Sequence, residues 1–396
     1  MFDKILGKIR PAKTEYAREF FSPDRRVKLG IELKNGVFSY RVEKDEKKII
    51  RASRLGMQFR GQEPLFLNLT LVRTQEKNFD ETWETLWGEQ HFIRNNYHEV
   101  AFYLVEARGA ERMFTLRFRI FNEGVAFRYE IPPQPKFQRV TVATEMTEFK
   151  VNPNAEHTPV TLEDKASGKF IALHEAALYD YGEMTLHLSQ SGTLLSDITP
   201  LSDGTKAHVS LPFSTPWRVV MIGDTATDLV TNRMIYNLNE PPKADFSWVK
   251  TLKFMGIWWA MFVGEWTWAP GDRHGATTEH AKAYIDACKR LGVPGLLIEG
   301  WNNGWEGDWL QNGDKTDFLT PMDDFKLEKV AEYARENKIK LVGHHETVGF
   351  VDNYEKQIEA AYKYYAKNGI FYVKPGYAGT MMEINGRKEY HHSQAG

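Results

Sequence analysis

Hydrophobic and polar residues alternate along most of the first 260 residues or so. Apolar side chains occupy every second position in 27–33, and the pattern resumes in 38–42 after Asn35-Gly36. Period two places alternate side chains on opposite faces of a strand, and Asn-Gly is a favoured hairpin turn. A second hairpin of this kind is predicted near residue 122. The pattern predicts antiparallel sheets packed face to face, a β-sandwich.

After about residue 250 the period changes, because short apolar runs now alternate with stretches that have a helical period of 3.6 residues. The predicted strands are 254–259, 295–299, 340–344 and 370–373. The predicted helices are 278–291, 325–337 and 353–368. Four strands joined by three helices are typical of half of a (β/α)8 barrel. The predicted fold is therefore multidomain β plus α/β, with an antiparallel β-sandwich followed by an incomplete (β/α)8 TIM barrel.

The domain prediction divides the chain into three segments. Residues 1–22 are expected to be an N-terminal extension, 23–248 the β-sandwich domain, and 249–396 the first half of the barrel. The sequence stops in the loop after the fourth predicted strand, which would leave a parallel strand edge unpaired. We therefore expect a barrel that is truncated after its fourth strand.

Composition and charge narrow the class of partner. Lys and Arg number 51, Asp and Glu number 53, and no long run of like charge occurs, so nucleic acid and membrane are not expected partners. Cys288 is the only cysteine, which excludes an intrachain disulfide and a thiolate metal cluster. The N-terminal stretch has the pattern of neither a secretory signal nor a membrane span. Aromatic residues make up 13% of the chain, a weak indication of sugar binding.

Catalytic groups of βα barrels lie at the C-terminal ends of strands. The predicted strands are followed by polar and aromatic clusters at 258–259, 298–303, 344–347 and 374–377. A single acid there is as easily an exposed loop charge, and a single histidine a hydrogen-bonded core residue. Four clusters at one end of a barrel favour a functional site.

The chemistry of these clusters favours a neutral polar substrate. A zinc site built from His344, His345 and Glu346 is not expected, since consecutive residues of a strand point to opposite faces and cannot converge on one ion. The chain also contains no Gly-rich loop followed by Lys-Ser/Thr, as phosphate chemistry would favour. Carboxylates and aromatic rings with a neutral charge balance indicate a sugar.

Several long motifs carry a resemblance to a known family. In the barrel part these are FMGIWW, HGATT, IEGWN with GWE, and HHET, and in the sandwich part FNEG, LHEAA and TPWR. Together, and in this order, they closely resemble glycoside hydrolase family 97. The likeness extends over nearly the whole chain.

The resemblance implies calcium as cofactor. In the family a glutamate of the sandwich domain, at the position of Glu175 in LHEAA, reaches the barrel and binds the ion. A carboxylate suits a hard cation that takes oxygen ligands. From the residues alone, an interdomain salt bridge is the preferred interpretation of Glu175. The resemblance predicts instead that Glu175 faces the same cleft as Glu299 and Glu346.

The resemblance also implies a set of substrate-binding residues. Glu299, His344 and Lys374 are expected to contact the non-reducing sugar, and Trp258 and Trp301 to shape its pocket. An oligosaccharide is the expected partner, and the oligomeric state stays open. Family members are typically periplasmic, so this location is expected by resemblance.

The family's two stereochemical branches differ in their carboxylates. Inverting α-glucosidase-like members carry the glutamate of the HHE motif, here Glu346, and retaining α-galactosidase-like members carry an Asp nucleophile after strand four, where this chain has Gly376. This combination favours inversion with Glu346 as the general base. The general acid and the remaining calcium ligands are expected beyond residue 396.

The predicted function is therefore calcium-assisted hydrolysis that releases terminal α-linked glucose from oligosaccharides with inversion. Two alternatives stay open: a non-catalytic carbohydrate-binding protein with a vestigial half-barrel, and an α-galactosidase of the same family. Because the general acid is expected outside this chain, we expect the supplied chain itself to be inactive.

Overall fold

The computed structural model describes residues 14–107, 111–151, 158–379 and 381–396, and it divides into two compact units. The first, called here the sandwich unit, runs to Ser247 and also includes His392–Gly396, and the second, the barrel unit, is Trp248–His391. Each unit is described by itself. Within the described ranges, no helix has both the length and the apolar character needed to cross a lipid bilayer.

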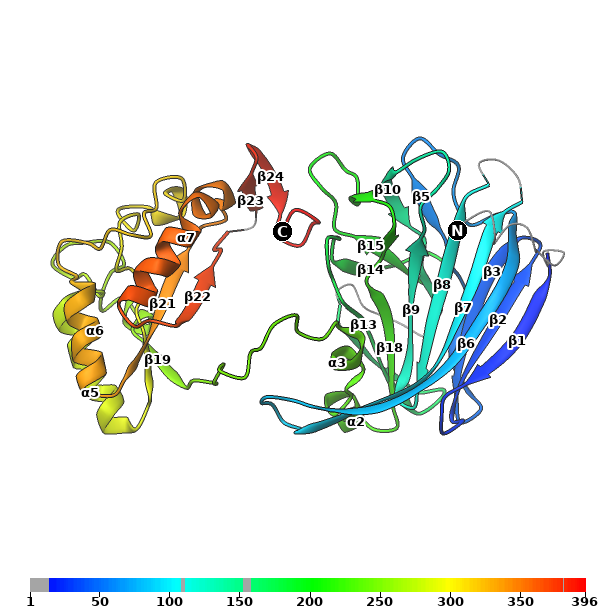
Figure 1. Cartoon of the computed structure of the whole chain (residues 1–396), viewed down its shortest axis with the longest axis horizontal. Coiled ribbons are helices and arrows are strands. Elements are labelled where there is room, and N and C mark those ends of the chain that lie inside the picture. Colours follow the sequence, from blue (N-terminus) through cyan, green and yellow to red (C-terminus); the bar gives the residue numbers. More distant parts are fainter. Residues whose placement is uncertain (1–13, 108–110, 152–157, 380) are drawn as a thin grey trace. The chain divides into compact units, whose positions relative to one another are not determined.

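The largest layer of the sandwich unit is an antiparallel sheet (Figure 1). Its strands, in spatial order, are β12 (Val160–Asp164), β13 (Lys169–Ala176), β18 (Trp217–Gly223), β9 (Gly124–Ile131), β8 (Met113–Phe121), β7 (Phe92–Glu106) and β6 (Leu69–Glu84), and β17 (Phe213–Ser214) pairs with β9. The hairpin predicted near residue 122 is the β8–β9 connection, where Phe121 pairs with Gly124.

A second antiparallel sheet packs on this one. Its strands are β1 (Tyr16–Phe21), β2 (Val27–Lys34), β3 (Val37–Lys44) and β4 (Lys47–Arg54). The predicted Asn35-Gly36 hairpin joins β2 to β3, and both turn residues have positive φ, 51° and 73°. Asn and Gly tolerate this left-handed conformation better than other residues, so the turn prediction is confirmed with its physical reason.

The predicted N-terminal extension, 1–22, needs a correction within its described part. Residues 14–22 are described, residues 1–13 lie outside the described residues, and Tyr16–Phe21 forms strand β1 rather than a separate extension. The strand pairs antiparallel with β2, from Tyr16 opposite Leu33 to Phe21 opposite Lys28. Phe20 is buried and packs edge-on against Phe102 at 5.7 Å between ring centroids, so burial of this ring ties the segment to the sandwich.

Two three-stranded antiparallel sheets and two short helices complete the sandwich unit. One sheet is β16 (Ala207–Ser210), β10 (Arg139–Glu145) and β5 (Met57–Phe59), and the other is β11 (Glu148–Phe149), β15 (Leu194–Ile198) and β14 (Met184–Leu188). The helices are α2 (Ala226–Val230) and α3 (Met234–Leu238).

The core of this unit lies between its sheets and is rich in aromatic rings. Phe38 of β3 contacts Phe102 of β7 at 5.3 Å between centroids, and Tyr40 of β3 contacts Phe127 of β9 at 5.0 Å. These rings are at most 1% exposed. Every second residue of β3 is buried, and most residues of β9 are buried. Alternating inward side chains from both sheets thus form the sandwich core, as the period-two pattern predicts.

The barrel unit is built from βα repeats. Its elements in chain order are β19 (Phe254–Gly256), α4 (Trp258–Phe262), α5 (Thr278–Leu291), β20 (Gly295–Leu297), η1 (Trp309–Gln311), α6 (Leu327–Glu336), β21 (Lys340–Glu346), α7 (Val351–Lys367), β22 (Tyr372–Gly376), β23 (Met381–Ile384) and β24 (Arg387–Tyr390). Strands β19, β20, β21 and β22 are neighbours in that order and all pair in parallel. The chain therefore combines an antiparallel sandwich with an incomplete (β/α)8 barrel, and the fold prediction is confirmed.

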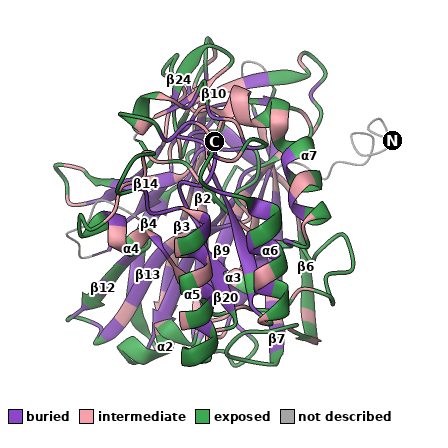
Figure 2. Cartoon of the chain, turned by 90° about the vertical axis from the view of Figure 1, so that its left-hand side faces the viewer, coloured by how far each residue is buried: buried purple, intermediate pink, exposed green. Residues whose placement is uncertain are grey.

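Helix α5 illustrates why the helices form where the pattern places them. The Thr277 hydroxyl accepts a hydrogen bond from the His280 amide at the first turn, and Gly292 ends the helix with φ of 68°. Ala281, Ile285 and Cys288 form its buried stripe, at the spacing of a single helix face. Figure 2 shows the opposite face as exposed.

The first predicted strand of the barrel, 254–259, is shorter than expected. Strand β19 ends at Gly256, and Trp258 and Trp259 belong to helix α4. A Cβ atom on Gly256 would overlap the indole of Trp258, so the absence of a side chain at 256 lets this ring fold back over the strand end. Tertiary packing of large rings has overridden the β-propensity of the segment.

Candidate active site

The barrel sheet brings four of the predicted site residues to one end of its strands. Glu299 follows β20, His344 and Glu346 lie in the last part of β21, and Lys374 lies in β22. In the parallel register, His344 is opposite Lys374 and Glu346 is opposite Gly376. Because parallel strands end on the same side of a sheet, these residues form one group, called here the barrel cluster.

Glu299 is the centre of this cluster. Its Oε1 accepts a hydrogen bond from Lys374 Nζ at 2.8 Å and lies 3.6 Å from His344 Nε2. The glutamate is 8% exposed, whereas the lysine side chain is 48% exposed. A buried carboxylate with an accessible ammonium group beside it offers both an acceptor and a donor to the hydroxyl groups of a ligand.

His344 is 2% exposed and its imidazole is neutral. Burial, and secondarily the charge of Lys374, lowers the pKa of this histidine to about 3. Neither ring nitrogen has a hydrogen-bond partner among the described residues. The indole of Trp305 lies beside the ring, with 5.9 Å between centroids. A buried polar ring without partners is costly unless a ligand or solvent satisfies it, which is typical of a binding site.

The side chain of His345 points to the other face of the barrel sheet, toward helix α7. Its ring stacks on Tyr365 of α7 at 4.7 Å and 7° between planes, and its Nδ1 lies 3.1 Å from the Tyr354 hydroxyl. Burial, and secondarily His344, lowers the pKa of His345 to about 4. The alternation expected for consecutive strand residues thus separates His344 from His345, and the second histidine is part of the helix packing.

Glu346, the predicted general base, is held by the backbone. Its Oε1 accepts hydrogen bonds from the amides of Val348 and Ala378, both at 2.8 Å. A Cβ atom built on Gly376 would overlap Glu346 Oε2. A side chain at position 376 and the observed orientation of Glu346 therefore exclude each other.

The two predicted tryptophans occupy different places. Trp301 is 2% exposed and belongs to the barrel core, where its Nε1 donates to the His344 carbonyl oxygen at 3.2 Å. The ring thus supports the strand end from behind. Trp258 of α4 contacts Trp259 and Phe262 edge-on at 5.5 and 5.2 Å between centroids. It belongs to an aromatic group of its own.

Sequence reasoning assigned no role to Trp305, although it lies closer to the barrel cluster than Trp258 does in the contacts just described. Its Nε1 donates to Asn302 Oδ1 at 3.1 Å, and its ring packs on Trp309 at 4.7 Å between centroids. The available signal was the aromatic position in the polar loop after the second barrel strand. Glu299 and Trp305 belong to the same loop, so the position of Trp305 could have identified it as a candidate site residue.

The sandwich unit holds a second charged group, called here the sandwich cluster: Arg218, Glu145 and Glu175. Arg218 donates from Nε and Nη2 to the two oxygens of Glu145, at 2.8 and 2.6 Å, and from Nη1 to Glu175 at 2.6 Å. The side chains are 0%, 0% and 5% exposed. Arg218 belongs to the TPWR motif, but its partners Glu145 and Glu175 are distant in sequence, so the motif does not predict this cluster.

Glu175 is thus already engaged, since its other oxygen accepts from the Met184 amide at 2.9 Å. Calcium takes 6–8 oxygen ligands. Among the described residues, no group of three or more His, Cys, Asp or Glu side chains could hold a metal ion. The Arg218 guanidinium lies against Glu175, so a cation bound there would have to replace one of its present partners. The calcium role of Glu175 and its position facing Glu299 and Glu346 stay predictions.

The geometry leads first to a class. Parallel βα units that gather a carboxylate, a neutral imidazole and an ammonium group beside an indole at their C-terminal strand ends define a protein of the (β/α)8-barrel class with a polar site at the usual end of its strands. The sequence profile described as Glycosyl-hydrolase 97 N-terminal matches residues 20–157 and 151–241, and the profile described as Glycoside hydrolase 97 matches residues 258–395. The chain belongs to glycoside hydrolase family 97.

Solved structures agree with this assignment. A glycoside hydrolase family 97 enzyme from Pseudoalteromonas sp. strain K8, solved in complex with panose and with acarbose, is 35% identical with a TM-score of 0.91. The match covers 96% of this chain and 62% of that enzyme. A β-arabinopyranosidase structure, 18% identical with a TM-score of 0.71, shares the fold.

Curated relatives are more distant. A retaining α-galactosidase from Bacteroides thetaiotaomicron is 21% identical over 88% of this chain and 58% of its own length. A probable retaining α-galactosidase from Streptomyces bingchenggensis is 24% identical over 72% of this chain and 47% of its own length. The chain thus spans roughly half to three fifths of the relatives that it matches.

Proposed function

We propose that the barrel cluster is part of the active site of an exo-acting glycoside hydrolase that releases terminal α-linked glucose from oligosaccharides with inversion. The observation that carries the proposal is the arrangement of Glu346 and Gly376. Two backbone amides fix Glu346 Oε1, and the bare Gly376 leaves no place for a nucleophilic carboxylate at the end of β22. One carboxylate that activates water is the requirement of an inverting base.

The residues around Glu346 take binding roles in this proposal. Glu299 accepts hydrogen bonds from sugar hydroxyls, and Lys374 donates to a hydroxyl oxygen. His344 stays neutral at physiological pH because its pKa is about 3, so one ring nitrogen donates and the other accepts. The Trp305 indole is 3% exposed and packs beside the His344 ring, so it positions that imidazole.

The choice of glucose is supported by the family 97 enzyme of Pseudoalteromonas, whose structures contain panose and acarbose at 35% identity. An α-galactosidase is the second candidate, because the two curated relatives carry that activity in their names. Their identities of 21% and 24% are lower, and Gly376 disfavours the nucleophile that retention needs.

Calcium and location are separate parts of the proposal. Glu175 is proposed to contribute one carboxylate to a calcium site, which requires that it exchange a hydrogen bond from Arg218 or Met184 for the ion. We also propose a periplasmic location, which is expected only because it is typical of the family. Because the remaining calcium ligands are expected beyond residue 396, calcium binding is tested on the protein extended to a complete barrel. The chelator-treated protein is titrated with Ca²⁺ and its thermal midpoint is measured, because a ligand that binds only the native state raises it. An unchanged midpoint at millimolar Ca²⁺ would remove Glu175 from this role.

The experiment for the catalytic proposal follows the first product anomer. Because the supplied chain is itself expected to be inactive, panose and p-nitrophenyl α-glucoside are incubated in a proton NMR tube with a protein that extends this chain to a complete (β/α)8 barrel. p-Nitrophenyl α-galactoside is the matched substrate. β-Glucose is expected before mutarotation, and the galactoside is expected to react at least about tenfold more slowly. The two aryl substrates differ only in the configuration at C4, so the ratio of their hydrolysis rates reports sugar specificity directly.

Three results would contradict the proposal in distinguishable ways. α-Glucose as first product would indicate retention and remove Glu346 from its role as base. Faster cleavage of the galactoside would favour the α-galactosidase. Saturable panose binding in calorimetry, with no hydrolysis above the buffer control, would favour a carbohydrate-binding protein.

A further inference from the structure

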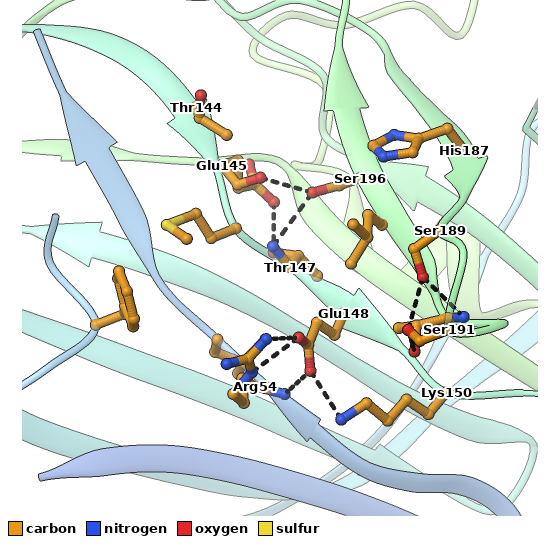
Figure 3. Close-up of a pocket in the computed structure, with 15 residues that line it drawn as sticks. Arg54, Thr144, Glu145, Thr147, Glu148, Lys150, His187, Ser189, Ser191 and Ser196 are labelled. Atoms are coloured by element: carbon orange, nitrogen blue, oxygen red, sulfur yellow. Dashed lines mark hydrogen bonds and ion pairs between the residues drawn. The ribbon is translucent and has the colours of Figure 1, made fainter.

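The sandwich unit contains a pocket of about 340 Å³ (Figure 3). Its lining residues lie between positions 54 and 196 and include none of the barrel strands. It is lined by residues from the end of β4, from β10 and β11, and from the β14–β15 hairpin. Its volume is at the lower end of the range of small-ligand sites. We call it the sandwich pocket.

Charged side chains along the pocket are fixed in place. Glu148 Oε1 accepts from Arg54 Nε at 2.8 Å, while Oε2 accepts from the Arg54 amide at 2.9 Å and lies 3.2 Å from Lys150 Nζ. Burial alone would raise the pKa of Glu148, but the hydrogen bonds from Arg54 lower it below its ordinary value, so the carboxylate is ionised. Figure 3 shows these three side chains grouped together.

Hydroxyl groups line another part of the pocket. Ser189, Ser191 and Thr193 come from the β14–β15 turn, and Ser196 comes from β15. The three turn residues hydrogen-bond to one another, with Ser189 Oγ 2.9 Å from Ser191 Oγ. These hydrogen bonds restrain the turn residues, and such restraint lowers the ordering cost of binding.

Apolar surface forms the rest of the lining. Leu55, Phe66, Met146 and Leu195 all contribute, and Phe66 is a half-buried aromatic ring. A pocket that combines hydroxyls and fixed charges with an aromatic ring fits a pyranose, whose edge carries hydroxyls and whose faces carry C–H groups.

The charges in and behind the pocket balance. Arg54 and Lys150 lie beside Glu148, and Glu145, which also lines the pocket, is paired with Arg218. Arg218 also donates a hydrogen bond to Glu175. The region therefore contains three positive and three negative side chains: Arg54, Lys150 and Arg218, and Glu145, Glu148 and Glu175. A balanced field neither attracts nor repels ions strongly, so an uncharged polar ligand is favoured over an anion such as sulfate or phosphate.

We propose that the sandwich pocket is a second, non-catalytic carbohydrate site that takes one neutral hexosyl unit of an oligosaccharide. Arg54 and Lys150 donate to its hydroxyl oxygens, the turn hydroxyls bond to its edge, and Phe66 packs on a ring face. The choice of glucose oligosaccharides as ligand rests on the proposed function. The site itself does not, because none of its residues belongs to the barrel cluster.

The test uses maltotriose and calorimetry on the whole chain, with Glu299→Gln as background to weaken binding at the barrel cluster. In that background we expect one remaining class of saturable site. Adding Arg54→Met is expected to weaken it at least about tenfold, through loss of a charge-assisted donor. The matched control is Arg60→Met, because Arg54 and Arg60 are both 59% exposed and both pair with a carboxylate, but Arg60 lies outside the pocket lining.

A second variant guards against misfolding of Arg54→Met. Ser191 is exposed in the turn, so Ser191→Leu is expected to fold normally and to fill the pocket, again weakening maltotriose at least about tenfold. Thermal unfolding checks that each variant is folded. No saturable binding in the Glu299→Gln background, equal affinity in Ser191→Leu, or sulfate binding tighter than maltotriose would each overturn the proposal, and none of these results depends on hydrolysis.

Discussion

Each of the two units contains a cluster of polar and charged side chains, but the hydrogen-bonding groups of the two clusters are satisfied differently. In the sandwich cluster, Arg218 binds both oxygens of Glu145 and one of Glu175, and the hydroxyl of Thr147 donates to Glu145 at 2.9 Å. In the barrel cluster, His344 is equally inaccessible, and neither of its ring nitrogens has a hydrogen-bond partner among the described residues.

This difference in hydrogen bonding distinguishes a cluster that stabilises the fold from a cluster that binds a ligand. A buried network with every member paired fixes one packing arrangement, and removal of one member leaves an uncompensated charge. A buried polar ring without partners costs stability and is retained where a ligand supplies the missing hydrogen bonds. We therefore expect substitutions in the sandwich cluster to change unfolding free energy, and substitutions in the barrel cluster to change ligand affinity or turnover.

The largest effect is expected at Glu346. Glu346→Gln keeps the shape but cannot take a proton from water, so kcat should fall about 10²–10⁴-fold with little change in binding. Gly376→Ala should reduce kcat to a similar extent, because its Cβ displaces the Glu346 carboxylate. Steady-state kinetics on panose measure both variants, each made in the protein extended to a complete barrel. Glu355→Gln, on the exposed face of α7, is the control and should leave kcat unchanged.

The next effect concerns Arg218. Arg218→Met should lower the free energy of unfolding by about 3–5 kcal/mol, because two carboxylates lose their buried partner. Urea unfolding followed by tryptophan fluorescence measures the change. Arg25→Met removes an exposed arginine of the same unit and should stay within about 0.5 kcal/mol of the parent. Equal stabilities of the two variants would show that the paired network is not a stabilising element.

A smaller effect is expected from pH. His344 and His345 have folded pKa values of about 3 and about 4, below the ordinary value of 6.5. The unfolded chain therefore binds protons more readily, and stability is lost as pH falls from about 6.5 toward 4. Each histidine should contribute about 1–3 kcal/mol to this loss. His345→Phe should flatten the pH dependence in urea titrations, and an unchanged slope would contradict the assignment.

The smallest effect is expected for Lys374→Met. Loss of its charge should raise the His344 pKa only slightly, because burial is the larger cause of the lowered value. Titration of the imidazole by heteronuclear NMR should show His344 still neutral at pH 6. Protonation near pH 6.5 would mean that the ammonium group, rather than burial, keeps this histidine neutral.

Local sequence patterns predicted the elements whose residues are close in the chain. The Asn35-Gly36 turn and helix α5 depend on neighbours within a few positions, and both are confirmed. The start of α4 was missed, because the Trp258 indole folds over Gly256 only in the packed barrel.

The candidate site follows the same rule. Parallel strands end together, so Glu299, His344 and Lys374 could be grouped from their strand positions. The sandwich cluster could not be predicted, since Glu145 and Arg218 are 73 positions apart and no local period connects them. Buried ion pairs of this kind are visible only once the sheets have packed.

Tyr365 of α7 also touches the backbone of β21, and this contact has a consequence for local opening of the barrel. Its hydroxyl accepts a hydrogen bond from the His344 amide and donates to the His344 carbonyl oxygen, both at 3.0 Å. The amide proton of His344 is therefore shielded by a helix side chain. Its deuterium exchange rate should report how often α7 detaches from the sheet, and Tyr365→Phe should accelerate that exchange while the amides inside α7 keep their protection.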